Sequence, residues 1–530
     1  MKYSFFIILQ MIFILNSFAQ VQQEWVRTFN NTNNSDDYPV NIGFDSLGNV
    51  LVLGTSNAQN LPKKLILIKY SKTGDLIWSR NFSTNVSSSE YPGSLVIDRN
   101  SNIYVCSSNS NKIVIIKFDS TGNVIWVNKF SRGNYAYYTS IDLDVNMNVY
   151  VAGDFEGGIV ILKYDIDGRL LWQKQILDVS ITSFQLLKLD KSSNVIITYY
   201  KYLSFDDIVV VKFTSQGDSL WARIYNSGNY DHPYDIDFDS NNNIYVLGES
   251  DGSPFSYNNY LFVLIKYDSS GNQKWIRKYD GNGLGRNYPV KVRTDKLGNI
   301  FVTGSAFYSN LGYDFTLIKY NSFGDSIWVS RFNDQGNDND FVSSIIVDNY
   351  NDIYSLGYSK NSDSSYRLTT LKYNQNGMLV WSQHQNSFHY SSIIPDASII
   401  IDSNYSIYVL GGLRSLNTDI DLMTIKYSQL IGINPISTEV PSKYTLHQNY
   451  PNPFNPSTKI KFEIPAGVVD IARICVYDIL GKEVRSIINE NLKPGIYEAE
   501  FNAADLPSGV YFYKLSAGGF IDTKKMILVK

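Results

Sequence analysis

The sequence predicts an all-β chain of repeated four-stranded sheets, followed by a smaller β domain. A repeat of about 50 residues fills most of the chain, and all eight tryptophans fall on it. Strand-sized apolar runs within each repeat are separated by Asp, Asn and Gly residues that favour turns. After residue 430 the repeat stops, and eight of the fifteen prolines lie between Pro435 and Pro507.

Two residue types mark the repeat. The tryptophans are Trp25, Trp78, Trp126, Trp172, Trp221, Trp275, Trp328 and Trp381. A Lys followed by Tyr or Phe stands nine residues before seven of them, as Lys69 does before Trp78. An eighth pair, Lys426-Tyr427, has no Trp after it. The repeat therefore starts partway through a copy at one end and stops partway through a copy at the other.

Each copy reads as four short strands. In one copy these are residues 288–295, 299–304, 314–320 and 325–332. An Asp-x-x-x-Asn turn, here Asp295 to Asn299, joins the first two strands, and Gly324 supplies the positive φ of the last hairpin. The second and third strands are almost continuously apolar, which indicates sheets buried on both faces. Stacked blades of a β-propeller have that property, whereas a sheet with one wet face alternates.

The copy count predicts eight blades. The eighth set of first, second and third strands covers 395–402, 406–412 and 421–427, and it has no fourth strand of its own. The orphan strand 25–29 lies at the other end of the propeller region, residues 20–430. We expect it to complete the eighth blade, so that the N-terminal strand closes the ring and hides two sheet edges.

The first nineteen residues have the composition of an export signal. Lys2 supplies a positive start, and Phe5 to Leu15 is apolar except for Gln10. Ser17-Phe18-Ala19 ends the stretch with small residues at the positions that a signal peptidase reads. The apolar run is shorter than the ~20 residues that a membrane span requires. We expect residues 1–19 to be removed, and we expect no transmembrane segment in the mature chain.

The C-terminal part predicts a linker and a small Ig-like sandwich. Residues 431–445 contain Pro435 and Pro441 without a strand period, so we expect a linker. Residues 446–530 then hold six or so predicted strands in a separate domain. These strands are 459–464, 472–478, 483–488, 496–502, 509–517 and 523–529.

Both parts resemble known bacterial sequences. The pattern from Lys266 to Trp275 resembles a bacterial β-propeller repeat usually described as seven-bladed, from which our count of eight departs. Residues 446–530 resemble the sorting domain of type IX (Por) secretion substrates. The matching positions are Asn449, Pro451, Pro453, Phe454, Asn455, Pro456, Gly481, Gly509, Tyr511 and Lys524. This resemblance implies passage through the periplasm, contact with the type IX machinery, removal of the tail, and a secreted or outer-surface protein.

Composition argues against several classes of function. The net charge is −4 with no basic run, so we expect no nucleic-acid partner. Four histidines and two cysteines in different domains show no metal-ligand spacing, and we expect neither a metal nor another cofactor. The Asp-x-x-x-Asn turns offer too few oxygens for calcium. The sialidase box does not fit the spacing of Asp268, Gly271 and Trp275. Thr73-Gly74 to Trp78 is similar to an element of quinone-dependent dehydrogenases, but those enzymes use adjacent cysteines, whereas Cys106 stands alone. We interpret His384 and His389, which flank Ser387, as solvated loop residues.

One set of residues is a candidate ligand site. An aromatic residue or His often opens the first strand of a blade. The set is Tyr38, Tyr91, Tyr138, His232, Tyr288, Phe341 and Tyr390. In a propeller these positions gather on one face, where such rings suit protein or glycan recognition, although they could equally serve only to pack the loops.

Three hypotheses about function follow. The main one is a monomeric, non-catalytic binding protein for a protein or polysaccharide. The alternative is a lyase or glycosidase, with acids such as Asp37, Glu90, Asp231 and Asp340 converging at the channel mouth. The third is a spacer or matrix protein.

Overall fold

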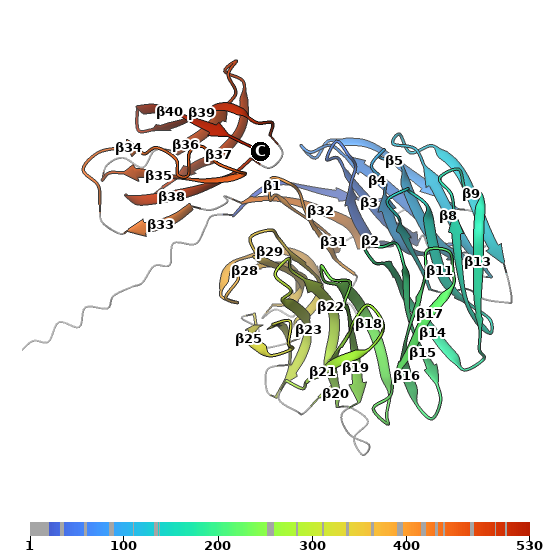
Figure 1. Ribbon diagram of the computed structural model, residues 1–530. Helices are drawn as coiled ribbons and strands as arrows, with labels where there is room; N and C mark the ends of the chain where they lie inside the picture. Colours follow the sequence, from blue (N-terminus) through green and yellow to red (C-terminus); the bar gives the residue numbers. More distant parts are fainter. Residues whose placement is uncertain are drawn as a thin grey trace, which may run out of the picture. The chain divides into compact units, whose positions relative to one another are not determined.

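The computed structural model consists entirely of strands and turns over the residues that it describes (Figure 1). These are residues 21–530 without 32–35, 58–60, 84–88, 110, 132–135, 137, 252–258, 282–284, 310–311, 335–338, 362–364, 390–395, 415–419, 430–432, 438–439, 467–470, 493 and 504–505. The predicted signal, residues 1–19, and Tyr390 lie outside them. Two compact units are present, one of residues 23–427 and one that includes residues 428–530. The described part of the chain has no helix long and apolar enough to cross a membrane.

The strands of the first unit form eight four-stranded sheets among the described residues. Seven of them use consecutive strands. The first two sheets are β2(Asp36–Phe44), β3(Val50–Asn57), β4(Lys64–Tyr70) and β5(Leu76–Phe82), then β6(Tyr91–Ile97), β7(Ile103–Asn109), β8(Lys112–Phe118) and β9(Val124–Ser131). The next two are β10(Thr139–Leu143), β11(Val149–Phe155), β12(Gly158–Tyr164) and β13(Leu170–Leu177), then β14(Ile181–Leu189), β15(Val195–Tyr202), β16(Asp206–Phe213) and β17(Ser219–Tyr225). The last three are β18(Asp231–Phe238), β19(Ile244–Asp251), β20(Tyr260–Tyr267) and β21(Gln273–Tyr279), then β22(Tyr288–Thr294), β23(Ile300–Tyr308), β24(Gly312–Tyr320) and β25(Ser326–Phe332), and finally β26(Phe341–Val347), β27(Ile353–Lys360), β28(Ser365–Tyr373) and β29(Leu379–His389).

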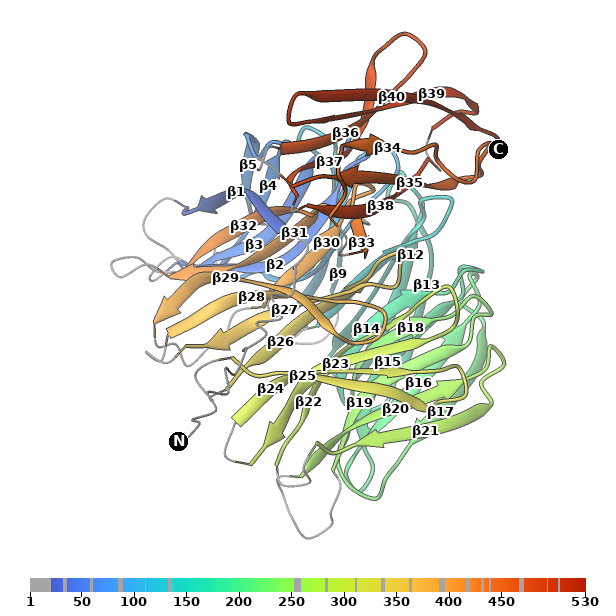
Figure 2. The same ribbon diagram turned by 90° about the vertical axis from the view of Figure 1, so that its left-hand side faces the viewer.

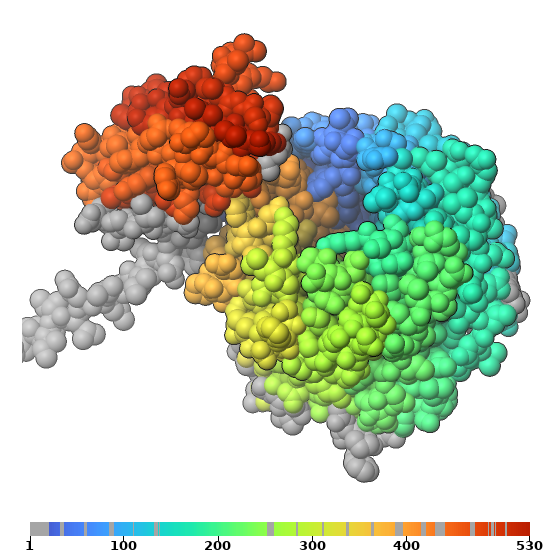
Figure 3. All heavy atoms as spheres, viewed as in Figure 1, coloured from blue at the N-terminus to red at the C-terminus, as the bar shows by residue number. Residues whose placement is uncertain are grey.

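The remaining sheet of this unit joins the two ends of its chain. Its order is β1-β32-β31-β30, with β1(Val21–Phe29), β30(Ser398–Ile401), β31(Ile407–Arg414) and β32(Ile420–Gln429). Figures 1 and 2 show the sheets following one another around the unit, so that orange β31 lies near blue β2, and β2 contacts both β30 and β31. The same succession of colours runs over the surface of the unit in Figure 3.

Side chains of the middle strands are buried, whereas those of the fourth strand are more exposed, as expected of sheets stacked face to face. Every residue of β7 and of β11 is buried, and β4 is buried except for Lys64. The fourth strand β5 has no fully buried residue. Apolar surface on both faces of the middle strands therefore packs against neighbouring sheets, which is the environment that the continuous apolar runs predict.

A repeated contact fastens each of several sheets to the next. The Trp Nε1 atom donates to a carbonyl in the last hairpin of the following sheet, as Trp275 does to Ser322 O at 3.3 Å. The Lys Nζ atom of the third strand donates to the same carbonyl, and Lys266 Nζ lies 2.9 Å from Ser322 O. Gly324, with a φ of 84°, stands directly over the Trp275 ring, where a Cβ would collide at 2.9 Å. We call this arrangement the tryptophan latch.

The latch recurs between the sheet of β1 and the sheet of β2–β5. Trp25 Nε1 donates to Lys72 O at 3.1 Å, and Lys426 Nζ reaches the same oxygen at 3.5 Å. Arg27 Nε donates to Gly74 O at 2.6 Å, and Gly74 packs on the Trp25 ring. The first and last strands of the unit are thus joined to the first complete sheet by the same atoms that join the interior sheets.

The turns behave as the sequence predicts. Asp98 Oδ1 accepts the amides of Asn100 and Asn102 at 2.8 Å each, and its Oδ2 accepts Asn102 Nδ2 at 2.8 Å. Ser101 takes a φ of 65°, at the position that Gly48 fills with a φ of 76° in the first complete sheet. The carboxylate closes its own turn, which is the local role expected of Asp in this setting.

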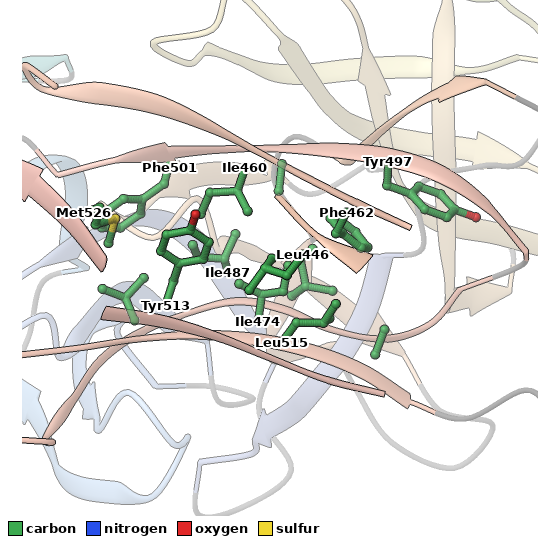
Figure 4. Packing of buried hydrophobic residues seen from close by; sticks show 14 of the residues in the cluster. Leu446, Ile460, Phe462, Ile474, Ile487, Tyr497, Phe501, Tyr513, Leu515 and Met526 are labelled. Carbon is green, nitrogen blue, oxygen red and sulfur yellow. The ribbon is translucent and has the colours of Figure 1, made fainter. Parts of the chain in front are cut away.

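The second unit contains two four-stranded sheets with a shared core. Their orders are β33-β38-β35-β34 and β37-β36-β39-β40. The bounds are β33(Ile433–Ser437), β34(Thr445–Leu446), β35(Ser457–Ile464), β36(Ile471–Tyr477), β37(Glu483–Asn491), β38(Gly495–Asn502), β39(Gly509–Ala517) and β40(Phe520–Leu528). Figure 4 shows Ile460, Phe462 and Phe501 of one sheet facing Ile474, Tyr513 and Leu515 of the other. Buried and less buried residues alternate along β35, as expected of a sheet with one core face.

The predicted linker 431–445 is not free of secondary structure. Residues Ile433–Ser437 form β33, which pairs with β38 at the edge of its sheet. Pro435 removes one amide donor, and the register shifts between Pro435 and Ser437. An edge position tolerates this loss because one side of the strand needs no partner, which is why proline content was a misleading signal here.

Candidate functional site

The predicted ligand residues occupy one equivalent place in successive sheets. We call the end at which the first and third strands begin, and the second and fourth strands finish, the upper end of each sheet. Tyr38, Tyr91, His232, Tyr288 and Phe341 lie within the first three residues of β2, β6, β18, β22 and β26, and Tyr138 directly precedes β10. All six therefore lie at the upper end.

The residue before five of these rings holds the neighbouring loops in place. Asp231 Oδ2 accepts the Ser227 amide at 2.7 Å, and Asp37 Oδ2 accepts the Asn31 amide at 2.7 Å. Asp340 accepts two amides, from residues 334 and 360, at 2.9 and 3.0 Å. Glu90 accepts the Ser107 hydroxyl at 3.1 Å, and the amide oxygen of Asn287 accepts the amide of residue 307 at 2.9 Å. Each of these five side chains is almost wholly buried.

These contacts bear on the acids that the enzyme hypothesis needs. Burial, partly offset by the two amide bonds, raises the pKa of Asp340 to about 7. Burial also raises the pKa of Asp231. A buried carboxyl group that accepts backbone amides is placed to order a loop.

Half-exposed rings at the upper end form a continuous band over neighbouring sheets. Tyr313, in β24, is the central ring, because its centroid lies 5.2 Å from Tyr288, 5.4 Å from Phe307 and 5.5 Å from Phe341. A second group surrounds His232, whose ring lies 4.6 Å from Tyr200 and 6.4 Å from Tyr230. We call these rings together with Tyr260 the aromatic band.

Arg286 joins the two groups of rings. Its guanidinium carbon lies 4.4 Å from the Tyr260 centroid and 5.1 Å from the Tyr288 centroid. Its Nη2 donates to Glu249 Oε1 at 2.7 Å, and the Glu249 side chain is wholly buried. Cation–π contact with two rings and an ion pair fix the guanidinium in one orientation.

His232 shares the same carboxylate. Its Nδ1 lies 2.9 Å from Glu249 Oε1, and its Nε2 lies 3.3 Å from Asp206 Oδ2. Burial lowers the pKa of His232, but the hydrogen bonds and charges of Glu249 and Asp206 outweigh burial and raise it above its ordinary value. A β-bulge between Pro233 and Asp235 leaves Tyr234 without a paired residue in β19. Burial, together with the charge of Glu249, raises the pKa of Tyr234.

Among the other predicted site residues, Tyr138 lies near enough to Tyr200 to contribute to its raised pKa, whereas Tyr38 and Tyr91 have other partners. The Tyr38 hydroxyl donates to Asp36 at 3.4 Å, and Lys63 lies 5.5 Å from the Tyr91 centroid. Tyr91 and Tyr138 are 46% and 56% exposed. The structure thus brings the predicted residues His232, Tyr288 and Phe341 together in one region. Arg286, Glu249 and Tyr313 lie in the same region, and we did not single out these three residues from the sequence. A cation two residues before an opening ring was the signal available for Arg286.

His384 differs from its sequence interpretation. It lies in strand β29 and not in a loop. Its Nδ1 lies 3.0 Å from Thr369 Oγ1, and its Nε2 lies 3.2 Å from Ser382 Oγ. Burial, followed by the nearby charge of Arg367, lowers its pKa.

The predicted sorting-motif residues fix the proline-rich loop that precedes β35. Asn449 Nδ2 donates to Pro451 O at 3.1 Å and to Thr458 Oγ1 at 2.9 Å, and its own amide donates to the Tyr513 hydroxyl at 2.7 Å. Phe454 exchanges backbone hydrogen bonds with residues 527 and 529 and is buried in the core. Gly481 has a φ of 77°, and the Tyr511 hydroxyl donates to Pro507 O at 2.8 Å.

Comparison with known families finds a match in each unit. Residues 448–530 match the secretion system C-terminal sorting domain, and residues 24–62 and 220–256 match the SBBP β-propeller repeat. No curated protein sequence matches the chain.

Solved structures give only remote likenesses. A fungal alcohol oxidase of the AA5 family is similar over 96% of this chain and 100% of its own, at 12% identity and a TM-score of 0.40. The Neurospora crassa Pan2 WD40 domain is similar over 69% of this chain and 94% of its own, at 11% identity and a TM-score of 0.40. A Dyadobacter fermentans protein of unknown function is similar over 77% and 99%, at 9% identity and 0.37. Scores this low carry no argument about function.

Proposed function

We propose that this chain, which carries β-propeller repeats and the sorting domain of type IX secretion substrates, is a non-catalytic binding protein. The sorting domain directs export through the type IX system to the cell surface or the extracellular space. The propeller unit acts there as a monomer and captures a polysaccharide or a protein on its upper end.

The proposed architecture is a single eight-bladed propeller closed at β1. The tryptophan latch between Trp25 and Lys72 supports closure, since it repeats the latch of interior sheets such as Trp275 and Ser322. The Gly412 amide, which donates to the Tyr358 hydroxyl at 2.8 Å, links the last two sheets. A closed ring would gather the upper ends of all eight sheets on one face.

The observation that carries the binding proposal is the aromatic band around Arg286. Rings that remain half-exposed offer flat apolar faces to a ligand, and the fixed guanidinium and imidazole beside them supply directed hydrogen bonds. Buried carboxylates and tilted ring contacts hold these groups in place before any ligand arrives, which lowers the entropic cost of binding. Glycans are the favoured ligand class, because sugars present both an apolar face and a dense set of hydroxyl groups.

The enzyme alternative lacks its proposed acids. Asp37, Glu90, Asp231 and Asp340 contact loop amides and side chains and are buried, so they hold loops at the upper ends of their own sheets. A lyase or glycosidase would need other groups at the upper end. Incubating any bound polysaccharide with the protein and measuring reducing ends or unsaturated products would separate the two hypotheses.

The binding test compares two tyrosines at equivalent positions. Wild-type exported chain, Tyr288→Ala and Tyr91→Ala are applied to a broad glycan array. Tyr288 belongs to the aromatic band, whereas Tyr91 opens its own sheet outside the band and is more exposed. We expect specific binding that Tyr288→Ala weakens and Tyr91→Ala leaves intact. Equal binding by all three proteins would contradict the proposed site, and no binding by wild type would contradict a glycan ligand.

A further inference from the structure

Three arginines at the upper end share one arrangement with carboxylates. The Arg286 side chain is 37% exposed while its partner Glu249 is wholly buried. Arg331 is 31% exposed and pairs with Asp314, which is wholly buried, and Arg367 is 19% exposed and pairs with Asp334 at 6%. In each pair the cation reaches solvent and the anion does not. The charge offered to a ligand at these three places is therefore positive, although the chain as a whole is negative.

Arg286 and Arg331 belong to the sheet of β22–β25 and Arg367 to the next sheet, and all three lie at the upper end. Arg286 precedes β22, Arg331 is the last residue but one of β25, and Arg367 is the third residue of β28. Arg331 also lies over a ring, since its guanidinium carbon is 4.0 Å from the Tyr308 centroid. Ring contacts and ion pairs leave these side chains little rotational freedom. Three oriented guanidinium groups over two sheets match a ligand with repeated negative charges better than a single anion.

The rings beside Arg286 favour a sugar polymer over a simple polyanion. Tyr288, Tyr313 and Phe341 connect the sheets of β22–β25 and β26–β29 through centroid distances of 5.2 and 5.5 Å. Guanidinium groups bind carboxylates in a planar, two-pronged manner, and aromatic faces stack on the CH face of a sugar ring. A uronic acid residue carries both features on one ring.

We propose that the upper end binds an acidic polysaccharide, with ring carboxylates on Arg286, Arg331 and Arg367 and sugar faces on the aromatic band. This inference rests on the proposed function and names its ligand class. Lysine in place of one of these arginines would keep the positive charge but lose the planar guanidinium that binds a carboxylate through two hydrogen bonds. Binding of the polysaccharide should therefore depend on more than charge.

The test measures binding of the exported chain to polygalacturonate and to the same polymer after reduction of its carboxyl groups. We expect polygalacturonate to bind at least tenfold more tightly. Arg286→Gln should weaken binding about tenfold, and Arg286→Lys should weaken it by severalfold. Arg80→Gln should have no effect, because Arg80 lies in β5 over Trp78 and outside the band. Since loss of Arg286 leaves the Glu249 charge buried alone, the double variant Glu249→Gln/Arg286→Gln keeps the test valid if the single variant is unstable.

Each of the other outcomes of this binding test would refute a specific part of the proposal. Equal binding of the reduced polymer would refute the acidic ligand and leave the glycan-binding function standing. Equally tight binding of polyglutamate would show that charge alone suffices and would refute sugar recognition. Absence of binding to either polysaccharide would refute the inference, and the glycan array would then decide whether the proposed function fails with it.

Discussion

Removal of Trp25 tests whether the first strand closes the propeller. Trp25 is buried, its Nε1 donates to Lys72 O at 3.1 Å, and Gly74 packs on its ring. Truncation of a buried Trp to Ala costs about 3–5 kcal/mol, and loss of the hydrogen bond leaves the Lys72 carbonyl with the weaker donor Lys426 Nζ at 3.5 Å. We expect Trp25→Ala to lower the free energy of unfolding of the propeller unit by about 4 kcal/mol.

The comparison variant is Trp275→Ala, which removes the same latch between two interior sheets. If the last sheet is joined to the first as the interior sheets are joined, the two variants should lower the free energy of unfolding by similar amounts. Leu47→Ser serves as the control, because Leu47 is an exposed turn residue whose loss should change stability by less than about 0.5 kcal/mol. Urea unfolding followed by far-UV circular dichroism measures all three. A cost below about 1 kcal/mol for Trp25→Ala, beside the full cost for Trp275→Ala, would refute closure at β1.

Further predictions concern a tryptophan, a histidine and the sorting domain. Trp381 Nε1 is buried without a partner among the described residues, so Trp381→Phe should be neutral or stabilising, whereas Trp275→Phe should cost about 1 kcal/mol in urea unfolding; equal costs would contradict this. Folding raises the pKa of His232, so its contribution to stability is complete below the unfolded value of about 6.5 and is lost as pH rises through the folded value. The stability difference between wild type and His232→Gln should therefore shrink as pH rises, and a difference that grows would contradict the ion-pair geometry. Asn449→Ala should cost the sorting domain about 2 kcal/mol and reduce the protein recovered outside the cell, while exposed Asn455 tolerates Ala; equal stability and export of both variants would contradict the anchoring role.

Much of the fold follows from local sequence patterns. The period of the Trp and Lys residues, the turns that open with Asp and the apolar middle strands each act over a few residues. The Asp-x-x-x-Asn form of the turn holds in six copies, and Asp352 and Ser406 replace the Asn in the last two. Predicted strand 509–517 coincides with β39, and predicted strand 25–29 falls within β1. The role of the tryptophans was predictable as scaffold, but the carbonyl to which a residue such as Trp275 donates lies in the next sheet and has no local signal.

The site was less predictable because it depends on contacts between sheets. Position in the repeat gave the same weight to His232, Tyr288 and Phe341, which belong to the aromatic band, and to Tyr38, Tyr91 and Tyr138, which do not. Arg286, Glu249 and Tyr313 come from three different strands or loops and meet only when neighbouring sheets are packed together. The acids before the opening rings looked available for catalysis in the sequence, and only their hydrogen bonds revealed that they hold loop amides.

Hydrogen–deuterium exchange of the exported chain, with and without polygalacturonate, tests the proposed binding surface most directly. We expect slower exchange in peptides that cover Arg286, Tyr288 and Tyr313 at the upper end of the sheets. The opposite hairpins, such as that of Asp119 to Asn123, should exchange at unchanged rates. Protection confined to those hairpins, with the aromatic band unaffected, would contradict the assignment of the upper end as the ligand-binding face.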